Sequence, residues 1–367
     1  MYLTSESLPS YMLQRAVLQA QDVTRPGLMI IEMSRRNRNF KVLRSDHPGC
    51  FIKQASSSKL MTTRTLHREA EFYRQAQNTP QLAAFRAIVP ELRDYDPVRH
   101  TLTLELLPDS QSISQLIMGK DDFRPDIAAD LGEKLAILHS SCPLENLPEA
   151  TKALLTGQVS SSLKLICDGK AQPLLQSRLT DGNCIEKLQT ILKNWRYEHL
   201  IHNDLKLDNV QICNPLPDKS HDTGKEHHLR IVDWELVDIG DICWDLACVL
   251  ISYIQLWALG CCETEDYPEI IEKVATEQPY LPPKVTSAIQ AFYSSYISLA
   301  GRSAIEREHL DDALRARLAV ITYEMSFEKE ELPTGAIFFA DMLTKYCRKS
   351  LRDKYPSIID QIARSAA

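Results

Sequence analysis

The chain has 367 residues, of which 44% are hydrophobic and 25% are charged, so it is long enough for two packed lobes and is not of the disordered or fibrous class. Its formal net charge is -7, with 42 basic and 49 acidic residues, which gives no electrostatic reason to expect a nucleic-acid partner.

The ten cysteines are scattered and include no Cys-x-x-Cys pair, a pattern typical of buried reduced thiols rather than of a disulfide framework or a zinc site. Residues 1–15 lack the apolar core of a secretory signal, so we expect a cytoplasmic protein. The longest apolar run, residues 242–259, contains Asp245 and Gln255. These polar residues indicate a buried core helix, and no membrane association is expected.

Residues 34–42 read S-R-R-N-R-N-F-K-V and contain no glycine. Side chains in this segment could donate hydrogen bonds to phosphate oxygens, because guanidinium forks and amides suit them. The candidates are Arg35, Arg36, Asn37, Arg38 and Asn39. The segment is therefore either a phosphate clamp or a solvated hairpin turn.

The next element is a short strand that ends near Lys53, followed by a predicted helix over residues 60–77. A strand lysine can neutralise phosphate groups, and a glutamate on the following helix can hold that lysine in place. Lys53 is the candidate for the first role. Glu69 lies close to the apolar face of the helix and is the expected partner, with Glu71 as the alternative.

Residues 101–107 alternate as a strand and then meet Pro108. We expect a nucleotide-binding lobe over residues 1–107 and a helical lobe with the catalytic loop, metal site and substrate cleft over residues 108–367. Backbone groups of Glu105 and Leu107 would then be available to an adenine edge. A helix is predicted over residues 127–139, where apolar residues recur at helical spacing.

Residues 200–209 and 231–235 carry the chemistry that a phosphoryl-transfer site requires. Asp204 would accept the proton of a substrate hydroxyl. Asn209 and Asp233 supply oxygen ligands of the kind that magnesium prefers. Alternating apolar residues in 210–212 and 229–231 predict a hairpin, lengthened by the polar segment 214–228, that brings Asn209 near Asp233.

The motifs H-N-D-L-K-L-D-N, I-V-D-W-E and G-D-I-C-W-D-L-A resemble those of the aminoglycoside phosphotransferase and choline kinase superfamily. The resemblance implies an α+β, two-lobed protein-kinase-like fold. Its small N-terminal lobe would hold an antiparallel sheet and one helix, and its larger C-terminal lobe would be mostly helical. The resemblance also implies ATP and Mg²⁺, with transfer of the γ-phosphoryl group to a hydroxyl.

The same resemblance assigns roles around the loop. His202 matches a structural histidine, and Asp245 matches an aspartate that supports the catalytic loop. Lys206 departs from most antibiotic kinases and is similar to the lysine that protein kinases place near the transferred phosphate.

Three functions from different classes follow. The first is a kinase for a hydroxyl of a small molecule, namely an antibiotic, an amino alcohol or a sugar. The second is a kinase for Ser or Thr in a precursor peptide, with a partner enzyme that processes the product, and the third is a pseudokinase binding module. Acidic stretches at residues 263–266 and 324–331 are either a receptor for a cationic substrate or solvated helix faces. The choice between ATP and GTP and the oligomeric state are not fixed by these residues.

Overall fold

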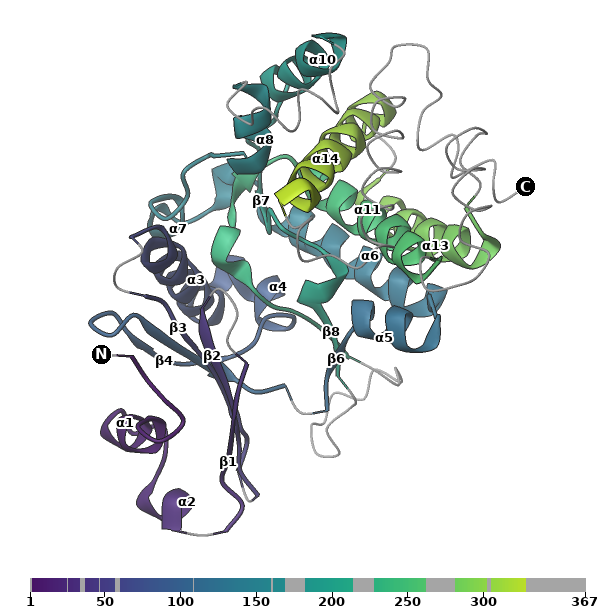
Figure 1. The fold of residues 1–367 in the computed structure, drawn as a ribbon. Helices are drawn as coiled ribbons and strands as arrows, with labels where there is room; N and C mark the ends of the chain where they lie inside the picture. Colours follow the sequence, from purple (N-terminus) through teal and green to yellow (C-terminus); the bar gives the residue numbers. More distant parts are fainter. Residues whose placement is uncertain are drawn as a thin grey trace. The chain divides into compact units, whose positions relative to one another are not determined.

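The computed structural model describes residues 2–24, 26–33, 37–45, 47–56, 60–107, 109–159, 161–168, 182–213, 228–261, 281–301 and 305–327. The chain divides into two compact units (Figure 1). The small unit comprises Met1–Ser112, Asn146–Leu155 and Asn209–Val237, and the large unit comprises Ile113–Glu145, Thr156–Asp208 and Asp238–Ala367. The lobe boundary at residue 107 stays a prediction.

The small unit is built on a five-stranded antiparallel sheet with the strand order β1-β2-β3-β5-β4. Its strands are β1 (Met29–Glu32), β2 (Arg38–Leu43), β3 (Cys50–Gln54), β4 (Leu92–Asp96) and β5 (Thr101–Glu105). The central strand β3 pairs with β2 on one side and β5 on the other, so its backbone is held on both edges.

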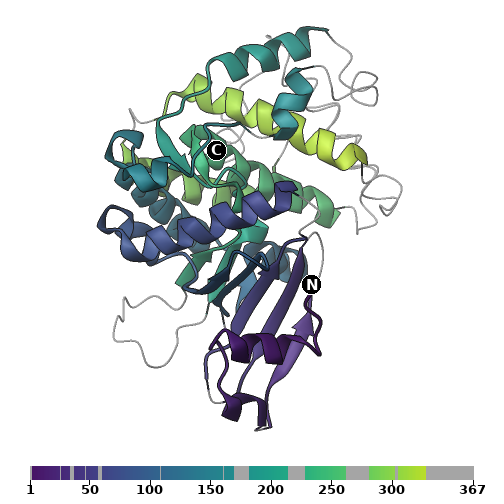
Figure 2. The same ribbon diagram turned by 90° about the vertical axis from the view of Figure 1, so that its left-hand side faces the viewer.

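Side chains of β3 alternate between the two faces of this sheet, as the pleat of a strand requires. Cys50 and Ile52 join a buried core with residues of α1 (Leu8–Gln14), which lies across the sheet in Figure 2. Lys53 points to the other face, where it meets α3 (Leu60–Asn78). The helix predicted over residues 60–77 is therefore confirmed.

The predicted hairpin is also confirmed, because β8 (Val210–Cys213) pairs antiparallel with β9 (His228–Ile231) and Val210 lies opposite Ile231. The short strand β6 (Gln111–Ser112) completes a three-stranded sheet with the order β6-β8-β9. After β9, the 3-10 helix η4 (Trp234–Leu236) packs on α3, where the Trp234 ring stacks on Phe72 at a centroid distance of 4.7 Å. Further short helices of this unit are α2 (Ala20–Thr24), η1 (Pro80–Leu82), α4 (Ala83–Arg86) and α7 (Glu149–Lys152).

The large unit is mostly helical. Its helices are α5 (Ile113–Lys120), α6 (Pro125–Ser141), η2 (Leu144–Asn146, at the junction of the two units), α8 (Ser161–Cys167), α10 (Gly182–Lys193), α11 (Ile242–Cys261), α13 (Pro283–Ala300) and α14 (Arg307–Phe327). A two-stranded pair joins β7 (His199–Ile201) to β10 (Asp238–Gly240), and the 3-10 helix η3 (Leu207–Asn209) follows the loop after β7. The sheet with α3 and this helical assembly confirm the predicted α+β class.

Helix α11 contains the longest apolar run. Among the described residues, it is the one helix long and apolar enough to cross a membrane, but 83% of its apolar window is buried within the protein. This burial confirms the predicted core helix.

Helices α6 and α13 approach each other at Gly132. A Cβ atom built on Gly132 would lie 2.2 Å from the backbone oxygen of Phe292 and 3.1 Å from the backbone nitrogen of Tyr296. The two backbones are therefore in direct contact, which only a residue without a side chain permits.

Candidate functional site

The small unit holds a cluster of one lysine and two carboxylates, in which Lys53 and Glu69 are buried and Asp233 is partly exposed. Lys53 Nζ lies 2.8 Å from Glu69 Oε1 and 2.5 Å from Asp233 Oδ1. The hydroxyl of Tyr73 donates a hydrogen bond to the same oxygen of Glu69 over 3.3 Å. The alternative partner, Glu71, pairs instead with Arg74 on its own helix. The structure thus brings Lys53 together with Glu69 and with the candidate metal ligand Asp233.

Burial sets the electrostatics of this cluster. Burial raises the pKa of Glu69 to about 7, although the neighbouring Lys53 charge acts in the opposite direction. Burial acts to lower the pKa of Lys53, but the carboxylates of Asp233 and Glu69 raise it well above its ordinary value. Lys53 is therefore a permanent cation, whereas Glu69 titrates close to neutral pH.

Asn209 and Asp233 stand at the same end of the β8–β9 hairpin. The N–H of Val232 donates to the carbonyl oxygen of Asn209 over 2.9 Å, which extends the strand pairing to the residue before Asp233. Asp233 has a left-handed backbone with φ 69° and ψ 49°. A carboxylate and an amide oxygen are a donor set that fits Mg²⁺, which is commonly held by one or two such groups together with phosphates.

In the large unit, the loop after β7 is fixed to the first turn of α11. The Asp245 carboxylate accepts the N–H of His202 at 2.7 Å and that of Asn203 at 2.9 Å. The indole N–H of Trp244 donates to the carbonyl oxygen of Asn203 at 3.0 Å. His139 Nε2 lies 3.5 Å from Asp245. Asp245 therefore holds the backbone immediately before Asp204, and Asn203 is left-handed there with φ 69°.

The Asp204 carboxylate lies between two cations. Lys206 Nζ is 3.1 Å from Asp204 Oδ2, and a guanidinium nitrogen of Arg317 on α14 is 3.7 Å from Asp204 Oδ1. The backbone N–H of Asp204 also donates to His202 Nδ1 over 3.3 Å.

Arg317 lies beside the candidate base Asp204, and the sequence motifs do not reveal this neighbour. It stands more than a hundred residues after Asp204 and belongs to no motif. One signal was present, because Arg317 occupies the same helical spacing as the buried residues Leu310, Leu314 and Ile321. A charged residue among the buried apolar positions of a helix needs a partner, so its position could have identified Arg317 as a candidate site residue.

Residues of the proposed phosphate clamp are only partly described, because Arg35 and Arg36 lie outside the described residues. Arg38 bonds to the carbonyl oxygen of Leu3, so its guanidinium is used within the small unit. The side-chain oxygens of Asn37 and Asn39 are buried and have no hydrogen-bond partner. The phosphate clamp therefore stays a prediction.

Part of the segment expected to contact an adenine forms hydrogen bonds with other residues of the small unit. The N–H of Glu105 donates to the carbonyl oxygen of Glu91 at 2.8 Å, and the Glu105 carboxylate accepts the N–H of Glu91 at 2.9 Å. The carbonyl oxygen of Leu107 accepts the hydroxyl of Ser110 at 3.1 Å.

The acidic stretch at residues 263–266 lies outside the described residues, as do the side chains of residues 325–331. Glu324 is described and accepts a hydrogen bond from the hydroxyl of Ser162 at 2.9 Å.

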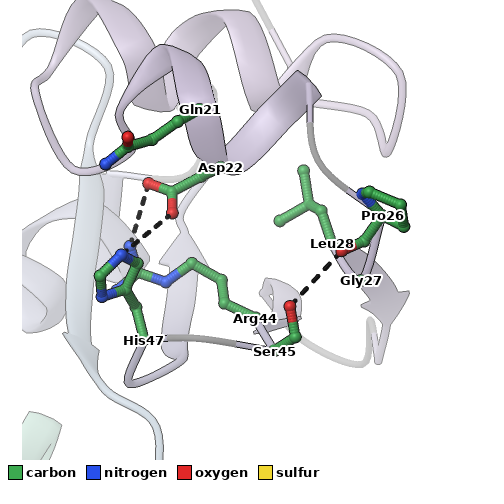
Figure 3. Close-up of a pocket in the computed structure, with 8 residues that line it drawn as sticks. All are labelled: Gln21, Asp22, Pro26, Gly27, Leu28, Arg44, Ser45 and His47. Atoms are coloured by element: carbon green, nitrogen blue, oxygen red, sulfur yellow. Dashed lines mark hydrogen bonds and ion pairs between the residues drawn. The ribbon is translucent and has the colours of Figure 1, made fainter.

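A polar pocket of the small unit lies beside α2 and contains none of the predicted site residues. It is lined by Gln21, Asp22, Pro26, Gly27, Leu28, Arg44, Ser45 and His47 (Figure 3). The main cause that lowers the pKa of Asp22 is a hydrogen bond from the backbone N–H of Gln19. The Asp22 carboxylate also lies 3.4 Å from Arg44. The charged groups of this pocket thus partner one another.

Comparisons with known proteins identify the family of this chain. The model of the phosphotransferase enzyme family matches residues 28–260. None of the curated proteins matches the sequence.

Solved structures share the fold at low sequence identity. A choline/ethanolamine kinase family protein from Mesorhizobium loti has a TM-score of 0.55 and 14% identity, with 98% of this chain and 99% of that chain covered. An ethanolamine kinase from Plasmodium vivax has a TM-score of 0.54 and 14% identity, with 95% and 88% covered. The amicoumacin kinase hAmiN has a TM-score of 0.54 and 11% identity, with 94% and 96% covered. The chain belongs to the phosphotransferase enzyme family and has the protein-kinase-like fold of the aminoglycoside phosphotransferase and choline kinase superfamily.

Proposed function

We propose that this phosphotransferase is a cytoplasmic, ATP- and magnesium-dependent kinase that transfers the γ-phosphoryl group to a hydroxyl of a small molecule. The observation that carries the proposal is the contact of Lys53 with both Glu69 and Asp233. It combines a fixed cation for phosphates with a candidate metal ligand, as nucleotide sites of kinases require.

On the nucleotide side, Lys53 binds the α and β phosphates, and Glu69 keeps the lysine in place. Asn209 and Asp233 hold magnesium, which when bound neutralises charge on the phosphate oxygens. Backbone groups near Leu107 meet the base. The solved complex of amicoumacin kinase with AMP-PNP and Ca²⁺ supports a nucleotide and a divalent cation for this fold.

On the acceptor side, Asp204 accepts a hydrogen bond from the substrate hydroxyl and orients its oxygen for in-line attack. The new oxygen–phosphorus bond forms as the bond to the leaving ADP oxygen breaks, and the hydroxyl proton passes to Asp204. Asp245 and His202 maintain the loop geometry, and Lys206 lies beside the base.

The state of the cysteines supports the proposed cytoplasmic location. The six whose state the structure gives are free and buried. Buried reduced thiols are typical of a reducing compartment.

A transfer assay with γ-labelled ATP tests the proposal. The acceptor panel contains aminoglycosides, amino alcohols, sugars, hydroxy acids and Ser and Thr peptides. We expect magnesium-dependent labelling of a small molecule, and Asp204→Asn should reduce turnover by about 100-fold or more, the usual weight of acid–base assistance. Labelling confined to peptides would favour the peptide-kinase hypothesis over the small-molecule hypothesis. Absence of both labelling and nucleotide binding would overturn the kinase proposal.

A further inference from the structure

Arg317 is a buried cation with at least one hydrogen-bond donor that finds no partner among the described residues. Its relative exposure is 5%, and its Nε atom is buried without a hydrogen-bond partner. Its contacts with charged or aromatic groups are the ion pair with Asp204 at 3.7 Å and the ring of Trp244, whose centroid lies 5.8 Å away. The distance to Asp204 is too long for a hydrogen bond.

A buried guanidinium nitrogen without a partner is uncommon in proteins, although Nε of Arg315 on the same helix is in the same state. A guanidinium carries five N–H donors in a planar fork, and buried polar groups in native proteins are nearly always hydrogen-bonded. A buried cation without such bonds is costly, so a group supplied from outside the chain is the natural partner. The planar fork of Arg317 matches the two oxygens of a carboxylate or a phosphate.

The location of Arg317 defines which molecule could supply that group. A hydroxyl that gives its proton to Asp204 must come within about 3 Å of a carboxylate oxygen. The acceptor molecule therefore lies beside Arg317 on one side of the carboxylate and beside Lys206 on the other. Both groups would repel a cationic acceptor and attract an anionic one, and together they outnumber the single negative charge of Asp204.

An acidic residue on the same helix is already engaged. Glu324 stands two turns beyond Arg317 on α14 and accepts the hydroxyl of Ser162. Lys206 and Arg317 are cations beside Asp204, and the negative charge of Glu324 also acts on Arg317.

We infer that Arg317 binds an anionic group of the acceptor, a carboxylate or a phosphate, and selects a hydroxy acid or a phosphorylated alcohol over an amino alcohol or an aminoglycoside. This inference rests on the proposed function, since it names the substrate class of the same phosphoryl transfer.

Steady-state kinetics with acceptors of matched size test the inference. The series contains hydroxy acids, phosphorylated alcohols, neutral polyols and amino alcohols, so the first two arms distinguish a carboxylate from a phosphate. The wild-type protein should give its highest kcat/KM with one of the two anionic arms. Arg317→Gln should raise KM for that acceptor about 30-fold, which corresponds to about 2 kcal/mol for a lost charged contact. Arg317→Lys keeps the charge but loses the planar fork, so it should raise the same KM by a smaller factor. The KM for a neutral polyol should change much less.

Arg315 provides a matched control on the same helix. It pairs with Asp311 at 2.5 Å and Asp312 at 2.8 Å and makes no contact with Asp204. Arg315→Lys should leave the KM of every acceptor unchanged. Circular dichroism and melting temperature establish that each variant folds.

Two results would overturn the inference. One is a wild-type preference for amino alcohols or aminoglycosides. The other is a uniform fall in kcat for all acceptors without a change in KM, because Arg317 would then act on Asp204 or on the transferred phosphoryl group. If the variants do not fold, competitive inhibition of the wild-type protein by carboxylates and by amines that lack a hydroxyl tests the inference instead. Stronger inhibition by the amines would contradict it. Failure of the proposed function looks different, since no acceptor of any charge would be labelled and ATP would not bind.

Discussion

At the scale of single residues, Lys53 and Glu69 depend on each other. Lys53→Met leaves Glu69 buried without a cation, and breaking a buried pair costs about 3 kcal/mol. The folded-state pKa of Glu69 is already raised to about 7, so its contribution to stability is present at low pH and is lost as pH rises through that value. We expect the variant to lose little stability at pH 5 and most at pH 8, measured by urea denaturation.

The double variant Lys53→Met/Glu69→Gln is the control for this prediction. A neutral amide has no charge to bury, so the double variant should recover much of the loss at pH 8 and show a flatter pH dependence. An equal loss of stability at pH 5 and pH 8 in the single variant would contradict the assignment.

Whether a residue near the site could be predicted from the sequence depends on how far away its partners lie along the chain. Lys53, Glu69 and Asp204 could be predicted, because strand and helix periodicity places each on a definite face or loop. Arg317 could not be placed at Asp204, since that contact depends on how α14 packs in the large unit. The acceptor class inferred from Arg317 could not be predicted from the sequence for the same reason.

At the scale of elements, the contact of α6 with α13 makes a sharp prediction. Helix propensity alone would favour Gly132→Ala by about 1 kcal/mol. The added Cβ would lie 2.2 Å from the Phe292 backbone oxygen, which cannot move without displacing α13. We expect a net destabilisation of about 2 kcal/mol, in the range for overpacked cores, measured by urea denaturation.

Gly119 on α5 is the matched control, because a Cβ built there meets nothing within 4 Å. Gly119→Ala should be neutral or stabilise the protein by about 0.5 kcal/mol. Destabilisation of similar size in both variants would show that helix contact is not the cause.

Periodicity predicted α3, α6, α11 and the β8–β9 hairpin well, since their apolar patterns are long or strictly alternating. The strand order β1-β2-β3-β5-β4 and the position of α1 on the sheet could not be derived. Strand order depends on pairings between distant segments, and α1 has only seven residues, too few for a clear helical period.

At the scale of the whole molecule, nucleotide binding should appear as thermal stabilisation. A ligand that binds only the folded chain adds about 2.7 kcal/mol at a hundredfold excess over its Kd. For a chain of this size we expect ATP with magnesium to raise Tm by roughly 5 °C, measured by differential scanning fluorimetry. The shift should vanish with chelator and shrink in Asp233→Asn. An equal shift with and without magnesium would contradict the roles of Asn209 and Asp233.

The left-handed backbone at Asn203 and Asp233 has an evolutionary consequence. Glycine, asparagine and aspartate adopt such a conformation most readily, so the backbone alone confines both positions to a small set of residues. Position 233 could drift among these three without disturbing the turn into η4. Under the proposed function, only aspartate in that set brings the charge that magnesium binding uses. In a lineage that abandoned catalysis the backbone would therefore still accept asparagine or glycine at position 233, and the contact with Lys53 would be the remaining constraint on this residue.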